Sequence, residues 1–271
     1  MRMWALAASA ILLLGMMTLK AQRPFREYPG VEYNDFPLPD DYAKPSEWVF
    51  ARLMYPPDPY SRNRGFGFGG GMDWKHGYSI WTQDYPRADR HFNLAVRRLT
   101  RIDSRSVEQP VDLDDDDDVF NWPWLYAVQV GRWKLTDSQA AKLREYLDRG
   151  GFFMVDDFWG SDDWEVFERS IRKVYADRPM DDLPRNDQIL HTVFDLSDLY
   201  QVPGARYRGS GVTEKCYACP PAWRGMRDPK GRVNVAATFD SDLGDSWEYA
   251  DDPSYDEKFR SEEHTSELQS H

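Results

Sequence analysis

The chain has 271 residues, of which 41% are hydrophobic and 30% are charged; this is the composition of a folded domain, and it excludes wholesale disorder. The formal net charge of −12 argues against nucleic acid as the main partner, because phosphate binding needs a basic surface. Aromatic residues make up 15% of the chain, so we expect either a thick core or a surface on which ligands stack.

Residues 1–22 have the features of a targeting segment. Arg2 supplies a positive start, the stretch from Met3 to Leu19 carries no charge, and Ala21 is a small residue at which a signal peptidase could cut. The uncharged stretch is at the short limit of a membrane span, so an uncleaved N-terminal anchor is the alternative to a cleaved signal peptide. We therefore expect a periplasmic or secreted protein that touches the inner membrane only through this segment.

Residues 23–46 are rich in proline, with Pro at positions 24, 29, 37, 39 and 45. Proline is disfavoured in helix interiors and in central strands, so this composition predicts an extended linker that lies on the following domain.

The first half of that domain contains a strand-like run at 48–55 and a glycine-rich stretch at 65–71. The spacing of the glycines fits no phosphate-binding fingerprint, so a flexible insertion is the favoured interpretation. Apolar residues at helical spacing predict a helix over 88–99. The short apolar run at 124–130 is typical of a buried parallel strand.

The second half begins with Thr136 and Gln139, which form the pattern of a capping box and predict a helix that ends before Gly150. A buried strand is predicted at 152–155, then a helix capped by Asp162, and a late strand at 233–239. Strands that alternate with capped helices predict one α/β domain over 47–259, with a mostly parallel sheet.

The end of the chain, residues 260–271, resembles the translation of a sequencing adapter. We set these residues apart from the fold, and we therefore expect a domain truncated at its C-terminus.

Two adjacent carboxylates, Asp156 and Asp157, directly follow the strand at 152–155. Ligands gather at the carboxyl ends of parallel strands, and paired carboxylates raise each other's pKa or share a cation. The alternative is that one caps the next helix and the other is solvated. His191, which lies in an apolar segment, is either a general base or a satisfied core residue.

Three further features have a simpler explanation than a site. The acidic stretch at 239–248 could hold a hard cation, but its spacing departs from the EF-hand and favours turn chemistry. The acid run at 114–118 is expected to be a solvated loop, with calcium binding as the alternative. Cys216 and Cys219 form a C-x-x-C pair without a second pair for zinc, which predicts a local disulfide or two incidental thiols. We predict no metal ligands and no cofactor.

Three stretches carry a resemblance to a known family: FNWPWLYA at 120–127, LREYLDRGGFFMVDD at 143–157 and SDLGDSWE at 241–248. On these stretches the domain resembles the bacterial domain of unknown function 4159 family. That family is distantly similar to class I glutamine amidotransferase-like and trehalose-utilisation (ThuA-like) domains. The resemblance implies a flavodoxin-like three-layer sandwich of the class I glutamine amidotransferase-like type.

The resemblance also bears on activity. Catalytic amidotransferases carry a nucleophilic Cys on a sharp turn after a central strand, and this chain has Asp156-Asp157-Phe158 at the comparable place. The resemblance therefore implies a fold and not that activity. We expect an exported, non-catalytic module that binds a small molecule, such as a carbohydrate, or a protein partner. Its candidate ligand-binding residues are Asp156, Trp159, Asp242, Trp247 and Glu248.

The alternative is a hydrolase or isomerase on a sugar-like substrate, with or without help from a metal. In that hypothesis Asp157 and His191 are the catalytic acid and base. Thiol redox chemistry at Cys216 and Cys219 is a third and weaker hypothesis.

Overall fold

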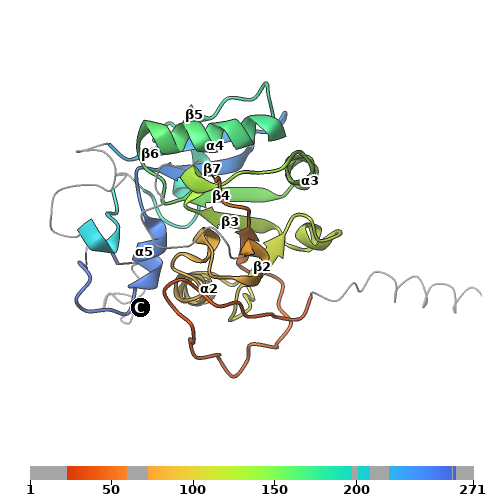
Figure 1. The fold of residues 1–271 in the computed structure, drawn as a ribbon. Helices are drawn as coiled ribbons and strands as arrows, with labels where there is room; N and C mark the ends of the chain where they lie inside the picture. The colour runs from red at the N-terminus through yellow and green to blue at the C-terminus, as the bar shows by residue number, and fades with distance from the viewer. Residues whose placement is uncertain (1–22, 60–72, 197–200, 208–219, 258, 261–271) are drawn as a thin grey trace, which may run out of the picture.

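Seven strands form one sheet in the part of the chain that the structure describes (Figure 1). The computed structural model describes residues 23–59, 73–196, 201–207, 220–257 and 259–260. The strands lie in the order β2-β1-β3-β4-β7-β6-β5. Their bounds are β1 Ala51–Met54, β2 Gln109–Asp112, β3 Trp124–Val128, β4 Phe152–Asp156, β5 Asp181–Asp182, β6 Ala222–Arg227 and β7 Val233–Phe239.

The sheet is mostly parallel, as the sequence predicts. Strands β2, β1, β3, β4 and β7 run parallel to their neighbours, whereas β6 is antiparallel to β7 and β5 to β6. The order of the parallel strands reverses between β1 and β3. In doubly wound sheets, ligands bind outside the carboxyl ends of the strands near such a reversal.

Helices cover both faces of the sheet, so the molecule is an α/β sandwich (Figure 1). Helices α3 and α4 contact each other on the face whose core contains Leu143, Phe153 and Phe167. Helices α2 and α5 contact each other on the opposite face, where Phe50 and Trp247 are buried. The helices are α2 Arg87–Leu99, α3 Asp137–Asp148, α4 Gly160–Val174 and α5 Leu243–Glu248, and the short 3₁₀ segments are η1 Trp74–His76, η2 Ile80–Thr82, η3 Asp118–Asn121, η4 Val130–Arg132, η5 Gln188–His191 and η6 Ala205–Tyr207.

The capping box predicted at the start of α3 is confirmed. Thr136 Oγ1 accepts a hydrogen bond from the Gln139 N–H at 3.2 Å, and Gln139 Oε1 accepts one from the Thr136 N–H at 3.0 Å. We expect Thr136→Ala to lower the free energy of unfolding by about 1 kcal/mol, as measured by urea denaturation. Thr136→Ser keeps the hydroxyl and is the control. If the alanine variant unfolds at the same urea concentration as the serine variant, the cap does not stabilise the helix.

The start of α4 differs from the prediction, which placed its cap at Asp162. The Trp159 N–H instead donates to Asp163 Oδ2 at 3.1 Å, and the Gly160 N–H donates to Asp240 Oδ1 at 2.8 Å. One of the two acceptors therefore comes from the end of β7, which is remote in the sequence. Neither Asp156 nor Asp157 caps this helix.

Helix α2 buries polar side chains that its apolar pattern did not indicate. Asp89, Arg90 and Asn93 are all buried. The two charged side chains are tolerated because they have partners inside the protein: Asp89 pairs with Arg52 of β1, and Arg90 pairs with Glu108 at 3.1 Å. Asn93 Oδ1 accepts from the Ser104 hydroxyl at 3.0 Å, whereas its Nδ2 has no partner among the described residues.

The proline-rich segment at 23–46 contains no helix or strand and packs on the domain. The Tyr28 ring lies edge-on to Trp81 with 5.6 Å between centroids, and Glu27 pairs with Arg90 at 2.8 Å. These contacts bring Glu32 and Tyr33 to the carboxyl edge of the sheet.

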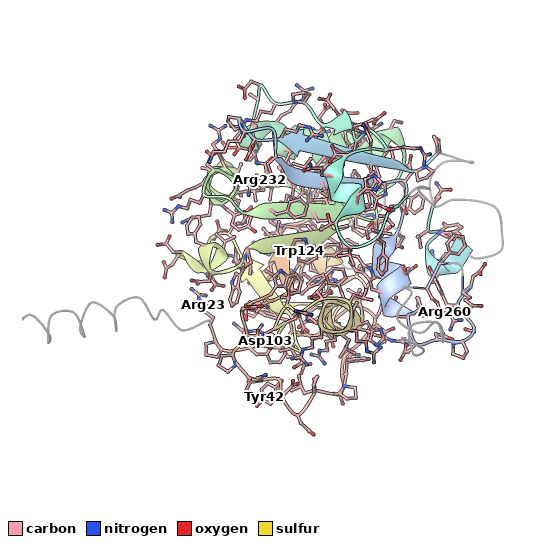
Figure 2. The ribbon with its side chains drawn as sticks, turned by 180° about the vertical axis from the view of Figure 1, so that it is seen from behind. Arg23, Tyr42, Asp103, Trp124, Arg232 and Arg260 are labelled. Atoms are coloured by element: carbon pink, nitrogen blue, oxygen red, sulfur yellow. The ribbon has the colours of Figure 1, made fainter. Side chains whose placement is uncertain are left out.

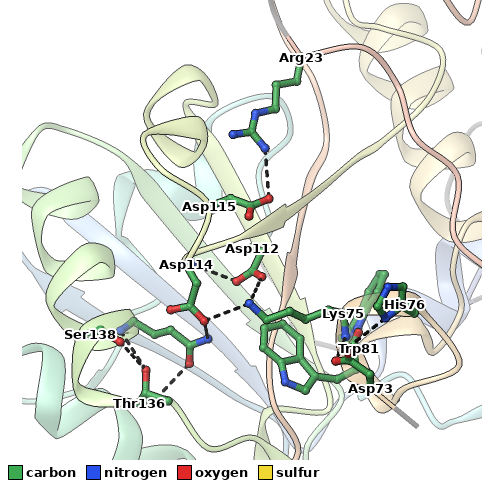
Figure 3. Close-up of polar contacts among 12 residues, drawn as sticks. Arg23, Asp73, Lys75, His76, Trp81, Asp112, Asp114, Asp115, Thr136 and Ser138 are labelled. Carbon is green, nitrogen blue, oxygen red and sulfur yellow. Dashed lines mark hydrogen bonds and ion pairs between the residues drawn. The ribbon is translucent and has the colours of Figure 1, made fainter.

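The acid run at 114–118 lies in a turn in which residues 114–117 are exposed, as expected of a solvated loop. Four of its five carboxylates also pair with basic side chains, and Figure 3 shows two of these pairs, Lys75–Asp114 and Arg23–Asp115. The pairs are Lys75–Asp114 at 3.4 Å, Arg23–Asp115 at 3.1 Å, Lys142–Asp117 at 3.3 Å and Arg23–Asp118 at 3.4 Å. The N-terminal segment, the segment around Lys75 and helix α3 supply these basic side chains, and the sequence of the run itself indicates none of these neighbours.

Several predicted features lie outside the described residues: the segment at 1–22, the glycine-rich stretch at 65–71, Cys216, Cys219 and the end of the chain from residue 261. Arg23 and Arg260, close to the two ends of the described chain, lie on opposite sides of the molecule (Figure 2). Among the described residues, none of the helices has the length and apolar character that crossing a membrane requires.

Candidate functional site

Three neighbouring strands end in left-handed turns at the carboxyl edge of the sheet. Gln129 follows β3 with φ 53°, Asp157 follows β4 with φ 51°, and Asp240 follows β7 with φ 57°. Residues other than glycine adopt this conformation rarely, and such strained positions cluster at binding and active sites. The candidate site therefore lies at this edge.

Carboxylates from separate segments meet next to these turns. They are Glu32 from the N-terminal segment, Asp84 from the turn before α2, Asp157 from the end of β4, and Asp242 and Glu248 from the start and end of α5. Ligand atoms of Asp84, Asp157 and Asp242 lie within 4.8 Å of one another, and so do those of Glu32, Asp84 and Glu248. Two oxygens on one Ca²⁺ are at most about 5 Å apart, because Ca–O bonds measure about 2.3–2.6 Å. Both sets therefore have the dimensions of a cation site.

Two carboxylate oxygens of this acid cluster are buried and accept no hydrogen bond from the described residues. They are Asp84 Oδ2 and Glu248 Oε2, and both residues are only 1% exposed. A buried polar atom without a partner costs about 1–3 kcal/mol, and more when it is charged. A bound cation would remove this cost.

Gly244, at the start of α5, permits the close approach of two acids. A Cβ at this position would lie 2.4 Å from Asp84 Oδ2 and 3.3 Å from Asp242 Oδ1. Only glycine therefore leaves room for the Asp84 carboxylate against the helix, on the side of Asp242.

Burial and mutual repulsion keep protons on the cluster. Burial, followed by the charge of Asp245, raises the pKa of Asp84 well above its usual range. Burial and the charge of Asp157 do the same to the pKa of Asp242. Burial and the charge of Glu248 raise the pKa of Asp245. The cluster therefore favours species that bring positive charge, either protons or a cation.

A pocket of about 110 Å³ gives access to the cluster from solvent. The residues that line it include four acids, Glu32, Asp157, Asp242 and Asp245, and two arginines, Arg132 and Arg206. A small polar molecule in this pocket would contact the acids that face it.

Asp156, which was expected to bind a ligand, has its hydrogen bonds satisfied inside the protein. Its Oδ2 accepts from the Tyr126 hydroxyl at 3.1 Å and from the Gly244 N–H at 2.8 Å, and its Oδ1 accepts from the Thr238 hydroxyl. The residue is fully buried. Asp156 therefore links the start of α5 to β4 and β7 through hydrogen bonds. Because Asp242 directly precedes α5, these bonds also help to fix its position.

The two expected tryptophans are also support residues. Trp159 is 1% exposed and donates from Nε1 to Asp157 Oδ1 at 2.7 Å, while Gln129 donates to the other oxygen of Asp157. These two bonds orient the Asp157 carboxylate. Trp247 packs in the core, with its ring 4.5 Å from that of Phe92.

His191 lies at the amino ends of the strands, whereas Asp157 lies at their carboxyl ends. Its ring nitrogens contact the Arg185 carbonyl at 2.8 Å and Asp195 at 2.9 Å. Residues next to it in η5 line a hollow together with the first residues of β4 and β7, whereas Asp157 follows the last residue of β4. The structure therefore separates the two residues that the enzyme hypothesis pairs as acid and base.

Sequence reasoning missed Glu32, Asp84 and Asp245 as site residues. Asp245 lies in the acidic stretch at 239–248, which does stand out in the sequence. Glu32 lies in the proline-rich segment and Asp84 in a turn before a helix, and no motif marks either position. Only the folded chain brings them to Asp157 and Asp242.

Comparison with protein families identifies the domain. A family model described as "Domain of unknown function (DUF4159)" matches residues 73–268, which is well over half of the chain. The matched residues include Asp84, Asp157, Asp242 and Glu248 of the acid cluster, while Glu32 precedes them. A comparison with curated proteins gave no match. The chain belongs to the DUF4159 family, as its sequence resemblance predicts.

Proposed function

We propose that this member of the DUF4159 family is a ligand-binding module whose acidic pocket takes up a divalent cation. The observation that carries the proposal is the Asp84 carboxylate. It is buried, its Oδ2 accepts no hydrogen bond from the described residues, and it lies within ligand distance of Asp157 and Asp242. A divalent cation would satisfy this oxygen and offset the repulsion between the three acids in one step.

The donor set favours a hard cation. Among the described residues, both groups of ligands consist of carboxylates alone. Oxygen ligands suit Ca²⁺, Mg²⁺ and Mn²⁺, whereas imidazole and thiolate favour other metals. We propose that a small polar molecule in the pocket is held through this cation. A binding role is what the sequence predicts, but a cation site departs from its prediction of no metal ligands. Export of the protein is a proposal that rests on residues 1–22.

We also propose that the sandwich is of the flavodoxin-like, amidotransferase-like type. The order of its parallel strands corresponds to the order 2-1-3-4-5 of flavodoxin-like sheets. Asp157 stands in a left-handed turn between β4 and α4, the place at which the resemblance implies a Cys in catalytic amidotransferases. An Asp at this turn argues against a covalent intermediate on a thiol, and its carboxylate is a suitable ligand for a hard cation.

The test is calorimetric titration of the full-length chain with Ca²⁺, Mg²⁺ and Mn²⁺ after treatment with a chelator. We expect saturable binding of at least one of these ions to the wild type. Asp84→Asn should weaken it at least tenfold, because Asn removes a charged ligand but keeps the shape of the side chain.

Asp115→Asn is the matched control. It also removes one carboxylate from an acidic group, but it does so in the run that pairs with Arg23 rather than in the cluster. It should bind the ion as the wild type does. The proposal fails if none of the three ions binds, or if the two variants lose binding equally.

A further inference from the structure

We infer that the site holds two divalent cations, with the Asp84 carboxylate as the bridge between them. The inference rests on the proposed cation-binding function and deepens it. One cation lies among Asp84, Asp157 and Asp242, and the other among Asp84, Glu32 and Glu248.

The two sets of ligands share a single residue. Each set brings its ligand atoms within 4.8 Å of one another, and Asp84 is the member common to both. A carboxylate has two oxygens and can therefore bind one cation with each. Paired metal ions in proteins lie about 3.5–4 Å apart, a distance that a bridging carboxylate spans.

The two carboxylate oxygens of Asp84 face different sets of ligands. Gln83 Nε2 donates to Glu32 Oε1 at 2.7 Å and also contacts Asp84 Oδ1 at 3.3 Å, so Oδ1 lies on the side of Glu32. Oδ2 lies against Gly244, close to Asp242 Oδ1. The carboxylate is therefore oriented as a bridge.

Each set of ligands also contains a carboxylate oxygen that accepts no hydrogen bond from the described residues. On the side of Asp242 it is Asp84 Oδ2, and on the side of Glu32 it is Glu248 Oε2. Both residues are 1% exposed. Glu248 is also close enough to the Asp245 side chain to share a proton with it. A second cation, among Asp84, Glu32 and Glu248, would satisfy Glu248 Oε2 without that proton.

The set formed by Glu32, Asp84 and Glu248, which we call the outer set, also explains why the N-terminal segment reaches the site. The Asp84 N–H donates to Glu32 Oε2 at 2.8 Å, and the Tyr33 hydroxyl donates to Glu248 Oε1. The first bond fixes Glu32 beside Asp84, and the second fixes Glu248, which lies within ligand distance of both. The outer cation would thus bind residue 32 to the domain.

The experiment is a count of bound Mn²⁺ per full-length chain, with free Mn²⁺ measured by electron paramagnetic resonance during titration. We expect two ions per wild-type chain, with the spin-coupled spectrum of a close pair. Glu248→Gln should retain one ion and lose the coupling, because Gln keeps the bond from Tyr33 but removes the charge. Asp157→Asn should likewise retain one ion.

Asp84→Asn should weaken both ions at least tenfold, and Asp115→Asn should still bind two. Circular dichroism spectra confirm that each variant is folded. A wild type that binds one ion, or two ions without spin coupling, overturns the bridged pair while the proposed function stands. A wild type that binds no Mn²⁺, Ca²⁺ or Mg²⁺ overturns both.

Discussion

Replacing Arg52 with Met is expected to lower the free energy of unfolding by about 3–5 kcal/mol. Arg52 and Asp89 are both fully buried. Arg52 Nε donates to Asp89 Oδ2 at 2.7 Å, and Nη2 donates to the other oxygen. Loss of the guanidinium leaves the Asp89 carboxylate buried without its counter-charge, and that uncompensated charge is what costs free energy.

Arg52→Met should also weaken cation binding, although Arg52 is not a ligand. Arg52 Nη1 donates to the carbonyl of Trp81 at 3.1 Å and to that of Gln83 at 3.0 Å. These bonds hold the turn in which Asp84 adopts a left-handed φ of 61°. Without them the turn is free to relax, and the Asp84 carboxylate moves out of position.

Urea denaturation of three proteins tests this prediction: the wild type, Arg52→Met, and the double variant Arg52→Met/Asp89→Leu. The double variant removes both charges and fills the space with apolar groups, so it should recover most of the lost stability. It should still bind cations weakly, because the turn before Asp84 remains unsupported. A single variant that loses less than about 1 kcal/mol, or a double variant no more stable than the single one, would contradict this account.

The second large effect is that a bound cation should stabilise the protein much more at pH 7 than at pH 4. The pKa values of Asp84, Asp242 and Asp245 are raised in the folded protein. In the unfolded chain these carboxyls titrate near about 3.9. The folded state therefore holds extra protons, and the stability that they provide is complete below about pH 4 and is lost as the pH rises through the folded pKa values.

The loss amounts to about 1.4 kcal/mol for each unit by which a pKa is raised. A cation takes the place of these protons. At a concentration one hundred times its Kd, it contributes about 2.7 kcal/mol at neutral pH. At pH 4, protons compete with the ion, and little stabilisation should be seen.

Thermal unfolding at several pH values, with chelator or with the ion that binds best, tests the direction in which stability changes with pH. Other carboxyls, such as those of Asp187 and Asp251, have lowered pKa values and make the protein more stable as the pH rises. They are present in the wild type and in Asp84→Asn alike, so the difference between the two proteins reports on Asp84. In chelator at pH 7 the variant should have a higher Tm than the wild type, and the difference should vanish toward pH 4. A variant that is less stable than the wild type in chelator at pH 7 would contradict the repulsion argument.

The sheet could be predicted from sequence where a strand forms a continuous apolar run. The apolar runs at 48–55, 124–130 and 233–239 contain β1, β3 and β7, and the run at 152–155 covers β4 except for its last residue, Asp156. The short edge strands β2 (Gln109–Asp112) and β5 (Asp181–Asp182) and the antiparallel strand β6 (Ala222–Arg227) were missed. Edge and antiparallel strands mix polar with apolar residues, and their pairing comes from neighbours that a local pattern does not contain.

The candidate site could be predicted only in part. Of the residues in the acid cluster, the sequence singles out Asp157 and Asp242, which each follow a buried strand, and Glu248, which belongs to the same acidic stretch as Asp242. Their roles stay predictions. Glu32 and Asp84 were not found, and His191 was paired with Asp157 although the two lie at opposite edges. The direction in which a chain crosses a sheet decides which edge a residue reaches, and no local pattern records it.

By itself the sequence determined the family, the α/β class and the local devices within one element, such as the capping box at Thr136. These depend on residues a few positions apart, whose interactions are set by helix and strand geometry. Only the tertiary structure decided the meeting of Glu32, Asp84, Asp157, Asp242 and Glu248. Their repulsion and raised pKa values arise from burial at short distance, and the sheet order, the left-handed turns and the Arg52–Asp89 pair together impose that distance.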